Sequence, residues 1–529
     1  MGIPGARFLS LIAALLAMGC GDSEHREPGR APDATSPDAA LGPVGEGTGV
    51  RVFSGTAGLI LDGPPCTNEK GAEGDRWCGF VTLTSDGARD LYVLNVSQVR
   101  AGVPVTCDEP DPNCILLTHG LVSSGANWHG NFFTGDTLVY YDETITPRAW
   151  RPGIKAGRVL VERPDAADVI FCAPASRGTA VTCLALPDVQ ADATLIGAEL
   201  YAGAADGETE PLLRPIDRVI LGRYADFGDA QRFSYGFPAT GYVAWTTRES
   251  PDGPEVLKLA HTSDLSAVTT VASDVHGWYV TADESRWYWQ YGINEIGTGL
   301  LQTATFPDGA DVTDVLPNVR HYELDANDAV VALTIDGALV SIPDAAGAPD
   351  DLRLIDEDVQ GLGGLSNQGV HVAYGKHFRT KDISDLFVSR LDATKACALD
   401  TTSGVPRRSV RFSAGGEGAL WMLSKGGLYD GFYTRLSDCS TAPVAPGVML
   451  MSWVGQETFV YTDDVNIDDE TGTLRYKRLG KNGALDASPS VVIAEDVFTT
   501  ASLDATLLYT VTESDDPERD GLYVRAFAR

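Results

Sequence analysis

The sequence predicts an all-β protein built around a single β-propeller. Short apolar strands recur along most of the chain, and Asp274-Val275, Asn318-Val319 and Asp358-Val359 open three successive units. These openings are roughly 40 residues apart, a length that suits one four-stranded propeller blade. No segment shows a sustained apolar period of 3.6 residues, so we expect few helices. Together these observations favour a ring of small antiparallel sheets.

The repeats extend over residues 157–529, and their count predicts about eight blades, with seven as the alternative. Units open near Gly157, Phe233, Val275, Val319, Val359, Val410, Val448 and Val497. From Phe233 onward a second apolar strand follows in each unit, as in Trp287–Trp289 and Val330–Leu333. The segment Tyr201–Asp229 interrupts this rhythm, and we interpret it as an insertion or a long outer connection.

Residues 50–156 form an irregular β region that contributes to the propeller. Gly79–Leu83 and Asp90–Leu94 flank a Ser-Asp-Gly turn and are predicted to form a hairpin. A further strand is expected at Leu138–Tyr141. Cysteine-bearing loops break the period here, so blades are not counted in this region.

The last unit predicts how the ring closes. Only three strands fit between Val497 and Arg529, whereas a blade normally has four. The segment Val50–Phe53 is short and β-prone, and it lies where the N-terminal linker ends. We therefore expect it to supply the missing strand of the final blade, which removes an open edge.

Residues 1–19 are predicted to be a lipoprotein signal peptide. Arg7 supplies a positive charge, and the apolar run Phe8–Met18 is too short for a mature transmembrane helix. Leu16-Ala17-Met18-Gly19-Cys20 resembles a bacterial lipobox. The resemblance implies cleavage before Cys20 and lipidation of its sulfur and its new amino group; the alternative is an ordinary secretory signal. Several acyl chains would anchor the chain durably in a membrane.

Residues 20–49 are predicted to be a lipidated flexible linker. Gly21–Gly49 lacks aromatic residues and is rich in Gly, Pro, Ala, Asp and Glu, so it has little apolar surface to bury. A flexible linker of this length would span about 30 Å on average. Gly21 directly after the lipidated residue leaves transport to the outer membrane open, with either the periplasmic or the surface face as its location.

The cysteines indicate an oxidising compartment. Apart from Cys20 there are eight, an even number that suggests disulfides in an exported chain, although eight cysteines allow many connectivities. Proximity favours Cys66–Cys78, Cys107–Cys114 and Cys172–Cys183, the last pair facing each other across a hairpin. Cys397–Cys439 is the fourth candidate pair and requires neighbouring blades to bring the two residues together.

Two sequence segments resemble a known repeat. Asp504–Thr510 followed by Asp520–Val524 resembles the WD40-like repeat of TolB-type propellers, and Asp385–Asp392 is similar to its third strand. The likeness extends over about residues 157–529, but the usual Ser-Pro-Asp-Gly turn is largely absent. The resemblance implies a propeller of the bacterial cell envelope that serves as a binding scaffold.

Charge and composition exclude some partners. The net charge of −33 repels phosphate backbones, so we expect no nucleic-acid partner. Asp464, Asn466 and Asp468 alternate as in part of a calcium loop. However, Asp469 occupies the position of the turn glycine and Arg475 that of the bidentate glutamate, which favours a solvated hairpin tip without a cofactor.

Aromatic and histidine residues have structural interpretations that we prefer. Trp245, Trp287, Trp289, Trp421 and Tyr509 recur on second strands, which favours packing between blades over a carbohydrate platform. His119 and His129 lie in the irregular region without a convergent third group. No nucleophile elbow, zinc-protease helix or phosphate-binding loop is found.

The sequence therefore favours a membrane-anchored envelope lipoprotein whose propeller binds a protein or a glycan. The alternative is a propeller-fold envelope hydrolase or lyase that acts on polysaccharide. A broad apolar patch on a blade flank would favour the binding module. Three or more carboxylates, histidines or arginines gathered on one propeller mouth would favour the enzyme.

Overall fold

The computed structural model describes residues 49–527, apart from internal gaps. The gaps are residues 60–64, 68–74, 85–86, 122–131, 155, 163–166, 176–178, 188–195, 208, 222–234, 237–240, 249–252, 295, 326, 344–351, 381–382, 406–409, 426–427, 481, 504, 513 and 515. Residues 1–48, which include Cys20 and all of the predicted linker except Gly49, lie outside the described part, as do Phe233 and His129.

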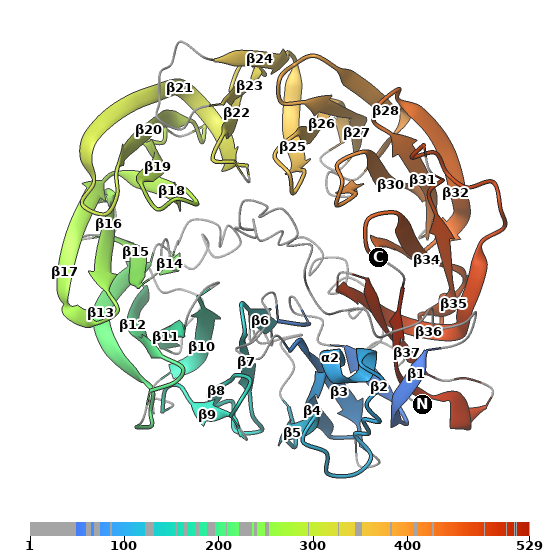
Figure 1. Cartoon of the computed structure of the whole chain (residues 1–529). Helices are drawn as coiled ribbons and strands as arrows, with labels where there is room; N and C mark the ends of the chain where they lie inside the picture. The colour runs from blue at the N-terminus through green and yellow to red at the C-terminus, as the bar shows by residue number, and fades with distance from the viewer. Residues whose placement is uncertain are drawn as a thin grey trace, which may run out of the picture.

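The described strands form a ring of ten four-stranded blades, numbered here in chain order (Figure 1). Six blades are separate four-stranded sheets, and the other four are joined in pairs into two seven-stranded sheets. Each joined pair shares one long strand, β21 (Ala310–Leu324) or β36 (Val491–Leu503). The first part of the shared strand is outermost in one blade, and its second part is innermost in the next.

Blades 1 to 5 follow each other from the N-terminal side. Blade 1 contains β2 (Ala57–Leu59), β3 (Trp77–Leu83), β4 (Arg89–Asn95) and β5 (Cys114–Thr118). Blade 2 contains β6 (Phe132–Thr134), β7 (Thr137–Tyr141), β8 (Pro147–Trp150) and β9 (Arg158–Val159). Blade 3 contains β10 (Ala167–Pro174), β11 (Ala180–Pro187), β12 (Ile196–Ala204) and β13 (Leu213–Leu221). Blade 4 contains β14 (Tyr235–Gly236), β15 (Tyr242–Arg248), β16 (Glu255–His261) and β17 (Asp264–Ser273). Blade 5 contains β18 (Val275–Val280), β19 (Arg286–Tyr291), β20 (Gly299–Thr305) and the first part of β21.

Blades 6 to 10 complete the ring. Blade 6 contains the second part of β21, β22 (Val330–Thr334), β23 (Leu339–Ile342) and β24 (Arg353–Asp356). Blade 7 contains β25 (Val359–Leu365), β26 (His371–Thr380), β27 (Ile383–Arg390) and β28 (Ala396–Val405). Blade 8 contains β29 (Arg411–Phe412), β30 (Gly418–Lys425), β31 (Leu428–Arg435) and β32 (Ser440–Val448). Blade 9 contains β33 (Leu450–Trp453), β34 (Thr458–Asn466), β35 (Thr471–Arg478) and the first part of β36. Blade 10 contains the second part of β36, β37 (Thr506–Val511), β38 (Gly521–Ala526) and β1 (Val50–Ser54).

The predicted all-β propeller is confirmed, but it contains more blades than predicted. The eight predicted units correspond to parts of the ring, while residues 50–156 contribute blade 1 and most of blade 2. The strand near Gly157 does not open a unit, because β9 pairs with β8 and completes blade 2. The segment Tyr201–Asp229 is not an insertion, since it contains the end of β12 and all of β13. Arg214, Pro215, Asp217 and Arg218 interrupt the apolar pattern of that outer strand.

Ten clusters of buried side chains hold the blades together, one between each pair of neighbours around the ring. The cluster that joins the last blade to the first contains Val52, Phe80 and Leu508. Trp245, Trp287, Trp289, Trp421 and Tyr509 all belong to such clusters and are at most 3% exposed. The prediction that these aromatic residues pack between blades is therefore confirmed.

Four blades open with a common backbone geometry. Asp274, Asn318, Asp358 and Asp496 adopt positive φ between 57° and 60°, and each precedes a valine that is at most 2% exposed. Asp and Asn tolerate this left-handed conformation better than most residues, because their short polar side chains find local hydrogen bonds. The sharp bend aims the following valine into the cluster between two blades. This requirement explains why the Asp-Val or Asn-Val pair recurs.

Helical structure is sparse in the described residues, as predicted. It consists of α2 (Val96–Arg100), with Asn95 as its N-cap, and the 3₁₀ turn η4 (Pro517–Arg519), with Asp516 as its N-cap. Both lie in connections between strands of the ring. Among the described residues, no helix has the length and apolar character needed to cross a bilayer.

Candidate functional site

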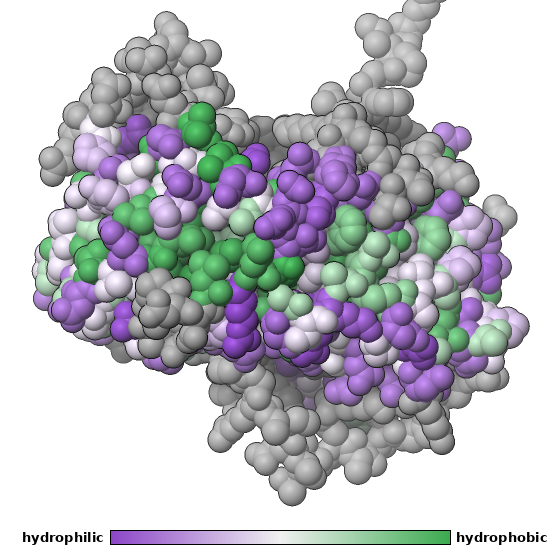
Figure 2. All heavy atoms as spheres, turned by 90° about the horizontal axis from the view of Figure 1, so that it is seen from above, coloured by the Kyte–Doolittle hydropathy of each residue, from purple (hydrophilic) through white to green (hydrophobic). Residues whose placement is uncertain are grey.

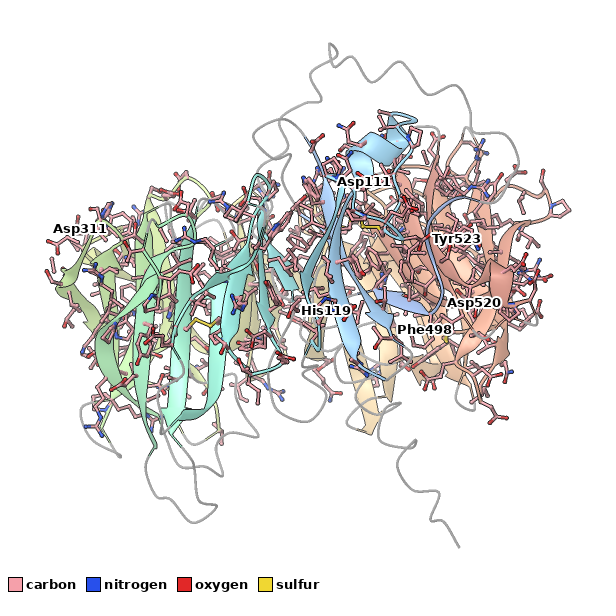
Figure 3. All side chains as sticks on the ribbon, turned by 90° about the horizontal axis from the view of Figure 1, so that it is seen from below. Asp111, His119, Asp311, Phe498, Asp520 and Tyr523 are labelled. Atoms are coloured by element: carbon pink, nitrogen blue, oxygen red, sulfur yellow. A yellow bond between two sulfur atoms is a disulfide. The ribbon has the colours of Figure 1, made fainter. Side chains whose placement is uncertain are left out.

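The two faces of the ring consist of different connections. At the crossover face the outermost strand of one blade leads into the innermost strand of the next, through residues such as Asp274 and Asp358. The loops between second and third strands also lie there. The opposite face, here called the turn face, carries the turns between first and second strands and between third and fourth strands. Figure 3 shows Asp111 and Asp311 toward the turn face and Asp520 nearer the crossover face.

Hydrogen bonds link the turns of neighbouring blades on the turn face. The Asp328 carboxylate accepts a hydrogen bond from the Ala282 amide at 2.6 Å. The Asn327 side chain donates to the Gln368 carbonyl oxygen at 3.0 Å, and Gln368 in turn donates to the Ala414 carbonyl oxygen. Four successive blades, 5 to 8, are thus connected turn to turn. These polar groups stabilise the ring and are already engaged with each other.

One buried histidine on the turn face has an unsatisfied ring nitrogen. His371, at the start of β26, is 7% exposed, and its Nδ1 atom has no hydrogen-bond partner. Its ring stacks on Phe412 of the next blade, with the centroids 6.1 Å apart. Burial, together with the positive charge of Arg390, lowers the pKa of His371 to about 4. The imidazole is therefore neutral near pH 7 and contributes to packing.

The outer wall of blades 5 and 6 carries exposed apolar side chains. Val312 on the outer part of β21 is 52% exposed, and Leu354 on β24 is 46% exposed. Leu352, just before β24, is 38% exposed. Figure 2 shows apolar residues gathered in a band on this wall, with hydrophilic residues above and below it. Because β24 ends its sheet, one edge of this short strand has no neighbouring strand in the described structure.

The densest charged cluster lies between blades 4 and 5 at the crossover face. Arg248 donates to Glu255 at 2.9 Å, and Glu255 lies 3.6 Å from Nδ1 of His276. Nε2 of His276 lies 3.7 Å from Asp274. Glu255 is only 5% exposed, and its Oε2 atom has no hydrogen-bond partner. The buried carboxylate therefore cannot reach a large substrate directly, whereas His276 and Asp274 are more accessible.

A row of hydrogen-bonded polar side chains connects the innermost strands of blades 8, 9 and 10, which form the inner wall of this part of the ring. An Nη atom of Arg411, on β29, donates to Oγ of Ser452, on β33, at 3.4 Å. Ser452 Oγ lies 3.1 Å from Oγ of Ser502, on β36. Trp453 donates from its indole nitrogen to the Arg411 carbonyl oxygen at 2.8 Å. These three innermost strands thus present a cation and two hydroxyl groups at the centre of the ring.

The structure contains four disulfides that involve all eight cysteines considered in the sequence. They are Cys66–Cys78, Cys107–Cys114, Cys172–Cys183 and Cys397–Cys439. The first three are the pairs that sequence proximity favoured, and the fourth is the candidate that required neighbouring blades to bring its cysteines together. Cys172 and Cys183 face each other across β10 and β11. Cys397 on β28 and Cys439 in the next blade are 5.3 Å apart between their Cα atoms, so this bond links blades 7 and 8.

The weak calcium candidates lie at the hairpin tip between β34 and β35. Asp464 forms an ion pair with Arg475 at 2.8 Å, and Asn466 donates a hydrogen bond to Asp469. Arg475 also binds Asp463 at 2.6 Å, so a cation from the protein itself occupies this acidic cluster. Within the described ranges, no three histidine, cysteine or acidic side chains are placed to hold a metal ion.

Of the two histidines considered, only His119 is described. Its Nδ1 atom lies 3.0 Å from the Asp90 carboxylate, and its side chain is 74% exposed (Figure 3). This surface ion pair lies near the crossover face of blade 1. Sequence reasoning missed Arg411, Ser452 and Ser502, which are 41 and 50 positions apart along the chain. What these three residues share is a position on the innermost strand of their blade.

Comparison with protein-family models and with curated protein sequences finds no match. Solved structures with a similar fold include one described as the eukaryotic initiation factor. That match has 11% identity and a TM-score of 0.44, and it covers 74% of this chain and 96% of the other. The β-propeller domain of the Trilobed protease from Pyrococcus furiosus matches with 10% identity and a TM-score of 0.31, over 62% of this chain and 97% of that domain.

TolB from Acinetobacter baumannii is also similar, with 11% identity and a TM-score of 0.26 over 61% of this chain and 81% of TolB. At such low identity the likeness concerns the fold alone. The class of protein defined by the strand pairing and the ten inter-blade clusters is a β-propeller. Its function is argued below from the described surfaces.

Proposed function

We propose that this chain is a lipid-anchored protein of the bacterial cell envelope whose propeller is a binding module for a protein or a glycan. The observation that carries the proposal is the apolar band on the flank of blades 5 and 6 (Figure 2). Large exposed apolar patches on soluble domains commonly mark interaction sites. Val312 and Leu354 are both about half exposed there, although the neighbouring clusters bury similar side chains fully.

A protein partner fits this flank best. Within the described part of the chain no strand pairs with the outer edge of β24, which lies beside the apolar side chains of Leu352 and Leu354. An extended peptide segment that adds a strand to such an edge gains backbone hydrogen bonds and buries alternate side chains. A glycan would gain less from aliphatic side chains, because most of its surface is polar. We therefore assign the flank to an extended segment of an envelope protein.

The disulfides support an exported protein. Disulfides persist in oxidising compartments such as the periplasm or the cell surface. The lipobox-like segment ending at Cys20 supports attachment to a membrane, and Gly21 is compatible with transport to the outer membrane. In this proposal lipid holds the ring near the membrane, while the linker leaves the flank free to bind.

A competition between two matched variants tests the flank. The full chain, purified in detergent, is used to capture partners from solubilised envelope, together with Leu354→Lys and Val492→Lys. Val492 is also 46% exposed on an outermost strand, but it lies on blade 9. We expect one partner to be captured by the natural chain and by Val492→Lys but lost with Leu354→Lys. Equal capture by both variants would contradict the assignment of the flank.

A second function, an envelope hydrolase or lyase acting on polysaccharide, is favoured by the charged cluster at the crossover face. Asp274 and His276 are accessible groups that could exchange a proton with a substrate, supported by Glu255 and Arg248. The test is release of reducing ends or unsaturated products from envelope polysaccharides. Activity that disappears in His276→Gln would support the enzyme, and no release by the natural chain would contradict it.

A further inference from the structure

The inner wall of blades 8 to 10 holds a cation without an acidic partner. Among the described residues, Arg411 forms no ion pair, and its side-chain hydrogen bond goes to Ser452. Two other arginines of blades 8 and 9 are paired with carboxylates: Arg435 binds Asp438, and Arg475 binds Asp463 and Asp464. The Arg411 guanidinium has no such partner in the described part of the chain and can therefore bind an external anion, although the chain as a whole has a net charge of −33.

Arg411 is exposed to solvent and lies on the innermost strand of blade 8. Its contact with Ser452 reaches the innermost strand of blade 9, so the guanidinium lies beside two blades at the inner wall. Neighbouring atoms lower its pKa by burial, and no carboxylate offsets that effect. The guanidinium remains protonated, because arginine keeps its proton in proteins.

The neighbouring groups define what an anion would meet. Ser452 and Ser502 provide two hydroxyl groups in contact with each other, 3.1 Å apart, and Ser452 also contacts Arg411. Trp453 is half-buried, and its indole N–H donates to the Arg411 carbonyl oxygen, which brings one aromatic side chain beside this set. Ligand sites typically combine such apolar walls with a few placed polar groups. The set offers one positive charge, two hydroxyl groups and aromatic surface.

The charge balance favours a ligand group with a single negative charge. A planar carboxylate matches the donor geometry of a guanidinium and can accept a further hydrogen bond from a serine hydroxyl. A doubly charged phosphate would experience stronger repulsion from the acidic chain and would find only one cation here. The hydroxyl groups and the Trp453 side chain suit a ligand body with both hydroxyl groups and C–H surface, as in a sugar ring.

We propose that Arg411, Ser452 and Ser502 form a binding site for a carboxylate-bearing sugar unit of a glycan. Arg411 would bind the carboxylate, and the two serines would bind the carboxylate or a ring hydroxyl. This site is separate from the apolar flank and depends neither on a protein partner there nor on the lipid anchor. It also differs from the charged cluster at the crossover face, which lies between blades 4 and 5.

The experiment measures binding of a uronic-acid oligosaccharide to the full chain in detergent by calorimetry. The comparison ligands are a neutral oligosaccharide of equal length, an acidic peptide and inorganic phosphate. We expect binding of the acidic oligosaccharide alone, weakened at least about tenfold in Arg411→Gln, because a hydrogen-bonded charge contact is lost. A smaller loss, about threefold, is expected in Ser452→Ala.

Arg435→Gln is the matched control, since Arg435 lies on the same blade but is paired with Asp438, and its binding should equal that of the natural chain. Thermal melting of each variant verifies folding, and Ser452→Ala provides the test if Arg411→Gln fails to fold. The proposal is overturned if the acidic oligosaccharide does not bind, or if Arg411→Gln and Ser452→Ala bind it as well as Arg435→Gln. It is also overturned if the peptide or phosphate binds more tightly.

Discussion

The backbone amide of Gly49 donates a hydrogen bond to the phenol oxygen of Tyr509 at 2.9 Å, across 460 positions of the chain. Directly after Gly49, β1 pairs with β38 and places Val50 opposite Val524. Tyr509 itself lies in the buried cluster between blades 9 and 10. The beginning of the described chain is therefore part of its last sheet. The ring closes through this pairing, as the three-stranded final unit predicted.

Deletion of residues 50–55 should destabilise the whole ring. It removes the outermost strand of blade 10 and takes Val52, which is 2% exposed, out of the cluster that joins blades 10 and 1. We expect the free energy of unfolding to fall by roughly 3 kcal/mol or more, since a buried side chain and a strand pairing are lost together. Thermal melting and light scattering measure the loss of stability and aggregation through the new edge.

Deletion of residues 21–45 is the matched control for this truncation. It shortens the chain by more residues but leaves β1 and its pairing with β38 intact. The midpoint of melting should equal that of the natural chain. If both deletions melt alike, β1 does not hold the ring together, and the energetic role assigned to it is wrong.

The disulfide Cys397–Cys439 should stabilise the protein more than Cys107–Cys114 does. Its cysteines are separated by 42 positions and join two blades, whereas the second pair closes a loop of 7. The chain-entropy estimate gives about 4 kcal/mol for the longer loop and about 2 kcal/mol for the shorter one. Replacing each pair by two alanines and measuring urea denaturation tests this order. The same loss for both pairs would argue against an entropic origin.

Much of the fold could be predicted from the sequence because several blades repeat the same local requirement. A residue that tolerates positive φ, such as Asp274 or Asp358, precedes a valine that must be buried. The same rule identifies the unit at Val497. Blades 1 and 2 were not counted from the sequence, because cysteine-bearing loops and short strands interrupt the repeat there. Likewise β13 was missed, since Arg214 and Arg218 are exposed on this outer strand and Asp217 accepts hydrogen bonds from Trp245 and Lys258 of the next blade.

The candidate sites could be predicted less well, because they depend on neighbours in space. The cysteine pairs could be predicted from the sequence, because three of them close short loops within one blade. Arg411, Ser452 and Ser502 come from three blades, and no spacing in the sequence relates them. The exposure of Leu354 on the flank could not be predicted either, because an apolar strand residue is normally expected in the core.

Acid should destabilise the protein through His371. Its pKa is lowered from 6.5 to about 4 in the folded protein, because the imidazole is buried and Arg390 lies nearby. Between these pH values the unfolded chain binds a proton that the folded chain does not. Stability from this residue is therefore fully present above pH 6.5 and is lost as the pH falls toward 4. The loss amounts to roughly 3 kcal/mol at pH 4.

A comparison with His371→Phe isolates this effect. Phenylalanine keeps the stacking on Phe412 but cannot take up a proton. Urea denaturation from pH 7 to pH 4 measures the free energy of unfolding of both proteins. As the pH falls, the natural chain should lose more stability than the variant. A constant difference for His371→Phe would refute the role of burial.

The lipid anchor gives the last prediction. Cys20 follows Ala17-Met18-Gly19 at the end of an apolar run, the arrangement that resembles a lipobox. Cys20→Ala should therefore block lipidation and release the protein into the soluble fraction of the cell. The propeller should fold unchanged, because residue 20 precedes β1 by about 30 positions and no described strand includes it. Fractionation after a high-salt wash, mass spectrometry of the N-terminal peptide and thermal melting measure these three outcomes.

Ser23→Ala, three positions away from Cys20, is the control for this prediction and should remain in the membrane fraction with its lipid. A Cys20→Ala protein that stays with the membrane would place the anchor elsewhere, whereas an unlipidated but secreted natural chain would identify residues 1–19 as an ordinary export signal.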